Sequence, residues 1–179
     1  AGENGPGRID TERVAEITHR LQLAVGLGAG GDAGFAGEWF RQLDADDVPA
    51  VEKVLRQSEP AAQAYLLREV LPHLAEEYAA LADMDDNDVR RRRAAAGTLR
   101  RIGQTRSLPD ILLNRLADIL VREEDAVVWQ EILTAVEQDA TEPVARIVQL
   151  AVNHRWPDVR RRGCEYVLRH GRPDFAPWV

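Results

Sequence analysis

Two segments decide the fold: Asp85–Gly103, DDNDVRRRRAAAGTLRRIG, and Trp156–Gly171, WPDVRRRGCEYVLRHG. Both carry Asp-Val-Arg at the expected start of a helix. Both end that helix at glycine, the residue favoured just beyond a helix C-terminus. An apolar stretch of helical character precedes each one, HLAEEYAALAD before the first and ARIVQLAVNH before the second. The two segments are therefore predicted to be the second helices of two similar helix pairs.

Helical periodicity extends over the rest of the chain. Val14, Ile17, Leu21 and Val25 recur at three- and four-residue steps, which places them on one face of a helix. Sustained alternation of apolar and polar residues is missing, and so are the turn dipeptides that join strands. The sequence therefore predicts an all-α protein.

Prolines mark a repeat in this pattern. Pro72, Pro109, Pro143 and Pro173 each stand at the predicted start of the first helix of a pair, at spacings of 37, 34 and 30 residues. Proline is tolerated in the first turn of a helix, so Pro72 is expected to end one helix and open the next. Periods of this size are typical of stacked helical repeats.

These features resemble the HEAT-repeat family. The resemblance rests on a helix ending near Asp, a short turn, and then Asp-Val-Arg entering a helix rich in small residues that closes at Gly. The middle repeat lacks the Asp-Val-Arg signature. The matching residues are Asp83, Asp88, Val89, Arg90, Ala95, Ala96, Leu99 and Gly103 in one repeat, and Asp158, Val159, Arg160, Gly163, Cys164, Val167 and Gly171 in another.

The resemblance implies a right-handed α-solenoid of stacked antiparallel helix pairs. Such a stack buries the apolar face that no single pair can bury alone, and it leaves an extended concave surface. We expect residues 47–179 to form one continuous domain of HEAT-like repeats. Residues 1–46 are expected to form an N-terminal helical cap.

Arginines supply the candidate binding residues. Arg93 and Arg100 are seven positions apart, as are Arg162 and Arg169, so each pair forms a stripe on its helix. The resemblance implies that these second helices line the concave face, where the stripes could bind phosphate or an acidic peptide. In the middle repeat Glu131 interrupts them, and a plain solvated face is the alternative interpretation.

Other residues carry both structural and functional interpretations. Arg90 and Arg160 resemble the family's structural arginine, which implies that each reaches an acidic residue of the neighbouring repeat. Trp129 and Trp156 are candidate anchors for a partner, although large aromatic residues at helical spacing more often pack in a core.

Catalytic, metal and cofactor sites are not indicated. The pattern formed by Gly26, Gly28 and Gly31 follows a helix, whereas a dinucleotide-binding loop follows a strand. The four histidines have no metal-ligand spacing, and the acidic run at residues 83–88 lacks the glycine and glutamate of a calcium loop. Cys164 stands among apolar positions, and no nucleophile motif is present. We therefore expect no enzyme, no cofactor and no metal.

Charge and composition limit the partner. The net charge is −7, although residues 90–106 hold seven arginines and no acid, and residues 155–172 hold six arginines. An acidic chain with two basic islands is unlike a duplex-DNA-binding domain, which is basic as a whole. Basic residues are 22 arginines and one lysine, a usage that hints at a GC-rich bacterial genome. No run reaches the roughly 20 apolar residues of a membrane span, and a cytoplasmic location is expected.

The sequence thus predicts a non-catalytic scaffold that binds a protein partner through the concave face of its repeats. The alternative is a nucleic-acid-binding module, or a helical-repeat protein similar to the DNA-alkylation glycosylases. Trp129, Trp156 and Asp158 are conceivable members of such a site, because those enzymes need tryptophans and a catalytic aspartate facing a basic groove.

Overall fold

The computed structural model describes residues 11–26 and 33–170, the side chains of residues 33–36 excepted. These residues form helices and turns, with no strand among them, so the prediction of an all-α protein is confirmed for this part of the chain. The chain divides into two compact units, Ala1–Tyr78 and Ala79–Val179. The two compact units meet after residue 78. The predicted boundary after residue 46 separates a cap from HEAT-like repeats, which is a different kind of boundary, and it stays a prediction.

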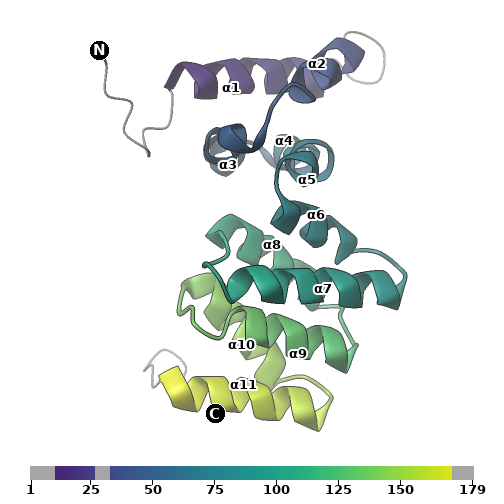
Figure 1. Cartoon of the computed structure of the whole chain (residues 1–179), viewed down its shortest axis with the longest axis vertical. Helices are drawn as coiled ribbons and strands as arrows, with labels where there is room; N and C mark the ends of the chain where they lie inside the picture. The colour runs from purple at the N-terminus through teal and green to yellow at the C-terminus, as the bar shows by residue number, and fades with distance from the viewer. Residues whose placement is uncertain (1–10, 27–32, 171–179) are drawn as a thin grey trace. The chain divides into compact units, whose positions relative to one another are not determined.

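The first unit contains the long helix α1 and several shorter helices (Figure 1). Helix α1 packs against α2, α3 and α4, and its buried residues are Val14, Ile17 and Leu21, three of the four on the predicted apolar face. A capping box between Asp44 and Asp47 starts the turn before α3. The elements are α1 (Thr11–Gly26), α2 (Ala33–Phe40), η2 (Ala45–Asp47), α3 (Val48–Gln57), α4 (Pro60–Tyr65), η3 (Leu66–Val70), α5 (Leu71–Leu74) and α6 (Glu76–Asp83), which crosses into the second unit.

Pro72 does not separate two helices as predicted. Helix α4, the π-helical turn η3 and α5 follow one another without a break from Pro60 to Leu74. Proline has no N–H for the helical ladder, and its ring collides with the carbonyl four residues earlier in a regular α-helix. A π-helical turn widens the ladder just before this position, which lets the chain continue in helical form.

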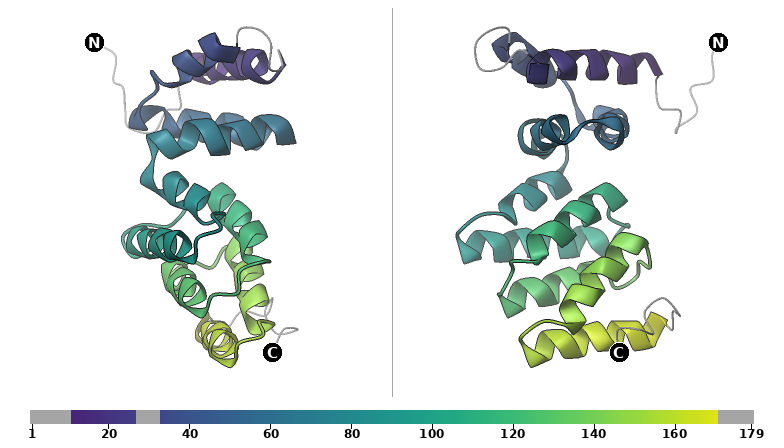
Figure 2. Two further views of the ribbon diagram at one scale, coloured as in Figure 1. Left: turned by 90° about the vertical axis from the view of Figure 1, so that its right-hand side faces the viewer. Right: turned by 180° about the vertical axis from the view of Figure 1, so that it is seen from behind.

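The second unit has two layers of helices. Helices α7, α9 and α11 form one layer, in which α9 contacts both neighbours, while α8 and α10 contact each other behind it. Figure 2 shows this arrangement from the side and from behind. The helices are α7 (Val89–Gly103), α8 (Asp110–Leu120), α9 (Ala126–Ala135), α10 (Glu142–Val152) and α11 (Pro157–His170).

Small residues allow the helices of this unit to approach closely. A Cβ atom on Gly103 would lie only 2.9 Å from the carbonyl carbon of Ala135, at the end of α9. A Cβ atom on Gly163 would lie 2.9 Å from the Val152 side chain of α10. Both glycines are buried, so each packs its bare backbone against the neighbouring helix. The large fully buried side chains of this unit include Met84, Leu99, Leu112, Leu113, Leu116 and Trp129.

None of the helices in the described ranges is long and apolar enough to cross a membrane.

Candidate interaction surface

Each arginine of the first predicted stripe, Arg93 and Arg100 on α7, meets a carboxylate of the α9 segment. Arg93 donates two hydrogen bonds to Asp125, Nε to Oδ1 at 3.0 Å and Nη2 to Oδ2 at 2.7 Å. Arg100 Nε lies 2.9 Å from Glu131 Oε2, without the alignment of a hydrogen bond. The two arginine side chains remain 47% and 46% exposed, so the pairs lie at the surface.

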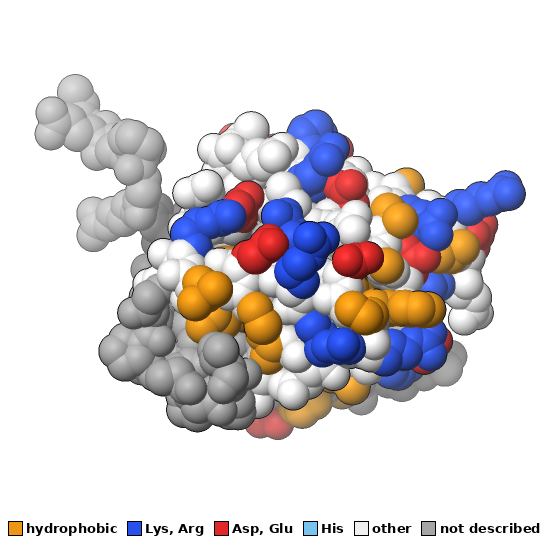
Figure 3. Space-filling model, turned by 90° about the horizontal axis from the view of Figure 1, so that it is seen from below, with side chains coloured by type: hydrophobic (Ala, Val, Ile, Leu, Met, Phe, Trp, Pro, Cys, Tyr) orange, Lys and Arg blue, Asp and Glu red, His pale blue; other side chains and the backbone are white. Residues whose placement is uncertain are grey.

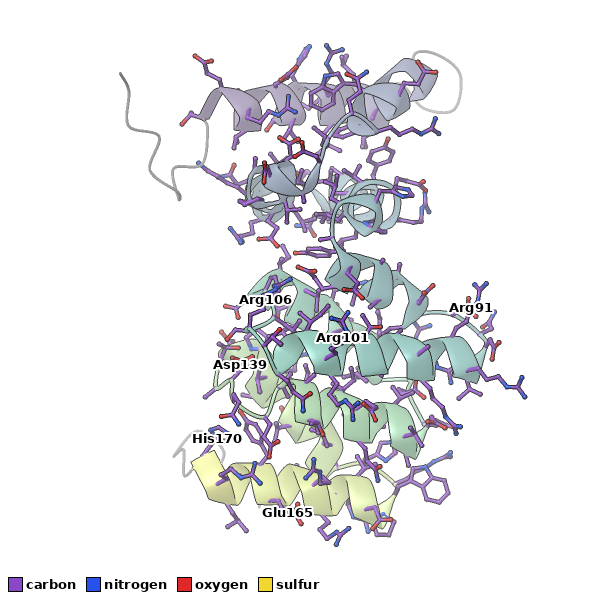
Figure 4. All side chains as sticks on the ribbon, viewed as in Figure 1. Arg91, Arg101, Arg106, Asp139, Glu165 and His170 are labelled. Atoms are coloured by element: carbon purple, nitrogen blue, oxygen red, sulfur yellow. The ribbon has the colours of Figure 1, made fainter. Side chains whose placement is uncertain are left out.

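The second stripe, on α11, also faces α9. Arg169 pairs with Glu137, while Arg162 donates to Thr134 Oγ1 at 3.0 Å and has Glu165 at 3.9 Å. Figure 4 shows the side chains between these ribbons and labels Glu165 on α11. A small hollow lies here, lined by Leu133, Glu137, Arg162, Glu165, Tyr166 and Arg169.

The segment of residues 123–137, which contains α9, therefore supplies acidic partners to arginines of both α7 and α11. We call the pairs Arg92–Glu123, Arg93–Asp125, Arg100–Glu131 and Arg169–Glu137 the arginine–carboxylate row. Glu131, predicted to interrupt the stripe, is the partner of Arg100. Five arginines of the two basic islands, Arg92, Arg93, Arg100, Arg155 and Arg169, thus meet acids that lie about one repeat away along the chain, which offsets their positive charge locally.

Glu123 is the most buried member of the row. Its side chain is 2% exposed, and its Oε2 accepts from Arg92 Nε at 2.7 Å. Its Oε1 accepts from the backbone N–H groups of Glu124 and Asp125, which are the last residues before α9. Its backbone carbonyl accepts from Trp129 Nε1 at 3.0 Å and contacts His154 Nε2 at 3.2 Å. One residue therefore connects α7, α9 and the segment before α11.

The prediction that Arg90 reaches an acid on a neighbouring repeat is wrong, whereas the repeat predicted to follow Arg160 lies outside the described residues, so that part stays a prediction. Arg90 is exposed, and it has no partner among the residues that the structure describes. Arg160 donates from Nη1 to the carbonyls of His154 and Arg155, six and five positions earlier. Arg92 makes the same two contacts, to the carbonyls six and five positions before it, and adds Glu123.

The error is one of register. Equal carbonyl contacts make Arg92 the counterpart of Arg160, and the helix starts, Val89 and Pro157, agree with this alignment. The Asp-Val-Arg triplets are two positions out of step because α7 has Asp88 as its N-cap, whereas Asp158 lies inside α11.

Trp129 and Trp156 occupy different environments. Trp129 is 1% exposed, and its ring lies 5.2 Å from the ring of His154, so it is a core residue. Trp156 is 45% exposed, with its Nε1 donating to the Glu124 carbonyl at 2.9 Å and the Arg155 guanidinium 5.1 Å from its ring centroid. Only Trp156 is available to a partner as an aromatic contact.

The ion pairs of the row shift the pKa values of their members. The hydrogen bond from Arg93, helped by the backbone N–H groups of Val128 and Val127, holds the pKa of Asp125 below its usual range. Conversely, Glu123 raises the pKa of Arg92, and Asp125 raises that of Arg93. Asp125 is also the N-cap of α9, where a negative charge is favoured by the helix dipole.

Residues weighed for metal or catalytic roles serve the local structure where they are described. No group of three or more His, Cys, Asp or Glu suited to a metal occurs within residues 11–26 and 33–170. In the acidic run, Asp86 accepts from Asp88 N and Arg91, and Asp88 caps α7. Asp158 pairs with Arg161 at 3.5 Å. Cys164 is half-buried, and of the pattern glycines Gly28 and Gly31 lie outside the described residues.

The role of Glu123 escaped the sequence reasoning because the acidic stretch Glu123–Asp125 has no motif of its own. Its spacing was an available signal, since it lies about one repeat beyond Arg92 and Arg93.

Comparison of the chain with protein-family models, with curated proteins and with solved structures finds no match.

Proposed function

We propose that the chain is a non-catalytic protein-interaction scaffold of the HEAT-like solenoid kind, and that it binds a protein partner through the layer formed by α7, α9 and α11. The observation that carries this proposal is the arginine–carboxylate row. Three of its four arginine side chains, those of Arg93, Arg100 and Arg169, are paired with a carboxylate and about half exposed, so these pairs present both charges to a partner.

A surface of paired charges suits a protein better than a nucleic acid. Duplex DNA carries one negative charge for roughly every 1.7 Å of helix axis, and it is bound by unneutralised Lys and Arg. Here Asp125, Glu131 and Glu137 lie between the arginines and would repel phosphates. A protein surface carries both signs of charge, so it can complement such a row while Trp156 adds an aromatic contact.

A charge swap tests the proposal without breaking the row. In the double variant Arg100→Glu/Glu131→Arg the ion pair persists with its polarity reversed, so the fold is kept while the surface pattern changes. The matched control is Arg146→Asp/Asp118→Arg. This pair joins α8 and α10 at 2.6 Å; its arginine is as exposed as Arg100, at 47% against 46%, while Asp118 at 48% is more exposed than Glu131 at 24%.

The readout is cross-linking of the purified wild-type chain to proteins of the source cell, followed by the same capture with each variant. We expect a partner that the wild type and the control swap retain and that the Arg100/Glu131 swap loses. A partner retained equally by both swaps, or no partner for the wild type, would contradict the proposal.

A further inference from the structure

Helices α7 and α11 share one register. Val89 and Pro157 are their first residues, and the same shift carries Arg92 onto Arg160, whose contacts with two preceding carbonyls are identical. The contacts that α7 makes with residues 123–131 therefore indicate what the corresponding residues of α11 can bind.

On α7, two arginines contact the acidic residues at the start of α9, and a third contacts a glutamate within α9. Arg92 binds Glu123, and Arg93 binds Asp125 two positions later through two hydrogen bonds. Arg100 lies seven positions after Arg93, about two turns further along α7, and pairs with Glu131, six positions after Asp125. The segment that α7 binds is thus a helix start of the form Glu-x-Asp, followed by a contact six residues downstream.

On α11, the corresponding residues are Arg160, Arg161 and Leu168. Arg160 uses Nη1 for the two carbonyls and has no acidic partner among the described residues. The Arg161 side chain is 69% exposed, with only Asp158 at 3.5 Å, an exposed pair of little strength. Leu168 is 76% exposed, which is unusual for a large apolar side chain.

These three residues belong to α11, the helix at the end of the second unit that Figure 3 presents, and arginine and hydrophobic side chains lie side by side on that face. We propose that this part of α11 binds the acidic start of a helix in a partner protein, with the sequence Glu-x-Asp and an apolar residue six positions after the Asp. The apolar residue meets Leu168, which stands where α7 has Arg100.

Charge and hydrophobicity together select this occupant. Among the described residues, Arg160 has no acidic partner and Arg161 has only the exposed pair with Asp158, so these two adjacent arginines can complement a Glu-x-Asp pair as Arg92 and Arg93 do. A nucleic acid would leave Leu168 against a phosphate backbone, whereas an amphipathic helix covers it. This inference rests on the proposed function, because it names the partner chemistry for one part of the same layer.

The test is fluorescence anisotropy of a labelled peptide with the full 179-residue chain. The probe is a helical peptide that begins Glu-Ala-Asp and carries Leu six positions after the Asp, and its matched control begins Gln-Ala-Asn. We expect the acidic peptide to bind, and the control peptide to bind roughly tenfold more weakly, since charge-assisted hydrogen bonds contribute more than neutral ones.

Variants locate the binding. Arg161→Glu and Leu168→Ser change exposed side chains, so folding is retained, and each is expected to weaken the acidic peptide roughly tenfold or more. Arg115→Glu on α8, an exposed arginine without a partner among the described residues, is the control and leaves the affinity unchanged.

Three results would overturn the inference: no peptide binding by the wild type, equal binding of the Gln-Ala-Asn peptide, or Arg161→Glu behaving like Arg115→Glu. A captured partner that is lost with the Arg100/Glu131 swap but kept by Arg161→Glu overturns this inference alone. Absence of any partner for the wild type counts against the scaffold itself.

Discussion

Gly103 offers the sharpest test of how closely α7 and α9 approach. An added methyl group there would lie 2.9 Å from the carbonyl carbon of Ala135 and 3.0 Å from its Cα, both backbone atoms that cannot rotate away. Gly103→Ala therefore forces the two helices apart, and overpacking of this kind costs about 1–3 kcal/mol.

Gly97 in the same helix is the matched control. A Cβ atom there meets nothing within 4 Å, so Gly97→Ala gains helix propensity worth about 1 kcal/mol without a steric cost. The two substitutions add the same methyl group to α7 and are expected to change stability in opposite directions.

Thermal unfolding followed by circular dichroism and by tryptophan fluorescence, to which the buried Trp129 contributes, measures both variants. A change of 1 kcal/mol shifts the Tm of a chain of this size by roughly 2–4 °C. We expect Gly103→Ala to melt roughly 2–12 °C below the wild type and Gly97→Ala a few degrees above it. Equal melting of Gly103→Ala and the wild type would refute the close approach of α7 to Ala135.

Three further outcomes follow from individual contacts. Glu123→Gln leaves the partly buried Arg92 without its carboxylate partner and is expected to lower the free energy of unfolding in urea by about 2 kcal/mol. The control Asp85→Asn removes an exposed pair with Arg122 and is expected to cost less than about 0.5 kcal/mol. Equal costs would contradict the argument from burial. Because Arg93 lowers the pKa of Asp125, the ionised Asp125 stabilises the folded state above about pH 4, and this stability is lost as the pH falls through the folded-state pKa. The difference in unfolding free energy between the wild type and Asp125→Asn should therefore shrink below about pH 4 and stay constant above it. Burial and the bond to Glu52 raise the pKa of Tyr78 above its ordinary range, so the wild type should lose stability relative to Tyr78→Phe as the pH rises beyond about 10, and parallel pH profiles would argue against this.

The sequence was sufficient for the helices and for much of the core. Apolar periodicity located the buried face of α1, and the order of α8 to α11 follows the predicted helix pairs. Local capping and periodicity depend on near neighbours in the chain, so they can be recognised in a single sequence.

Contacts between helices were harder to predict. Whether Arg90 or Arg92 faces the next helix depends on a shift of two positions, which turns a side chain to the opposite side of a helix. The pairing of Arg100 with Glu131 and the depth of Glu123 depend on how α7 and α9 pack, and no local pattern encodes that. Pro72 failed as a helix boundary because the π-helical turn at Leu66–Val70 accommodates it.

The central claim is that the arginines of the two predicted stripes are engaged with the segment that contains α9, and that they present a mixed-charge surface to a protein and not a groove to a polyanion. Fluorescence anisotropy of labelled duplex and single-stranded DNA with the purified chain at low salt tests it most directly. The account predicts no binding at high micromolar protein, because Asp125, Glu131 and Glu137 offset the guanidinium charges. Binding that falls steeply as salt rises, and that weakens on charge reversal of Arg162 and Arg169, would contradict it.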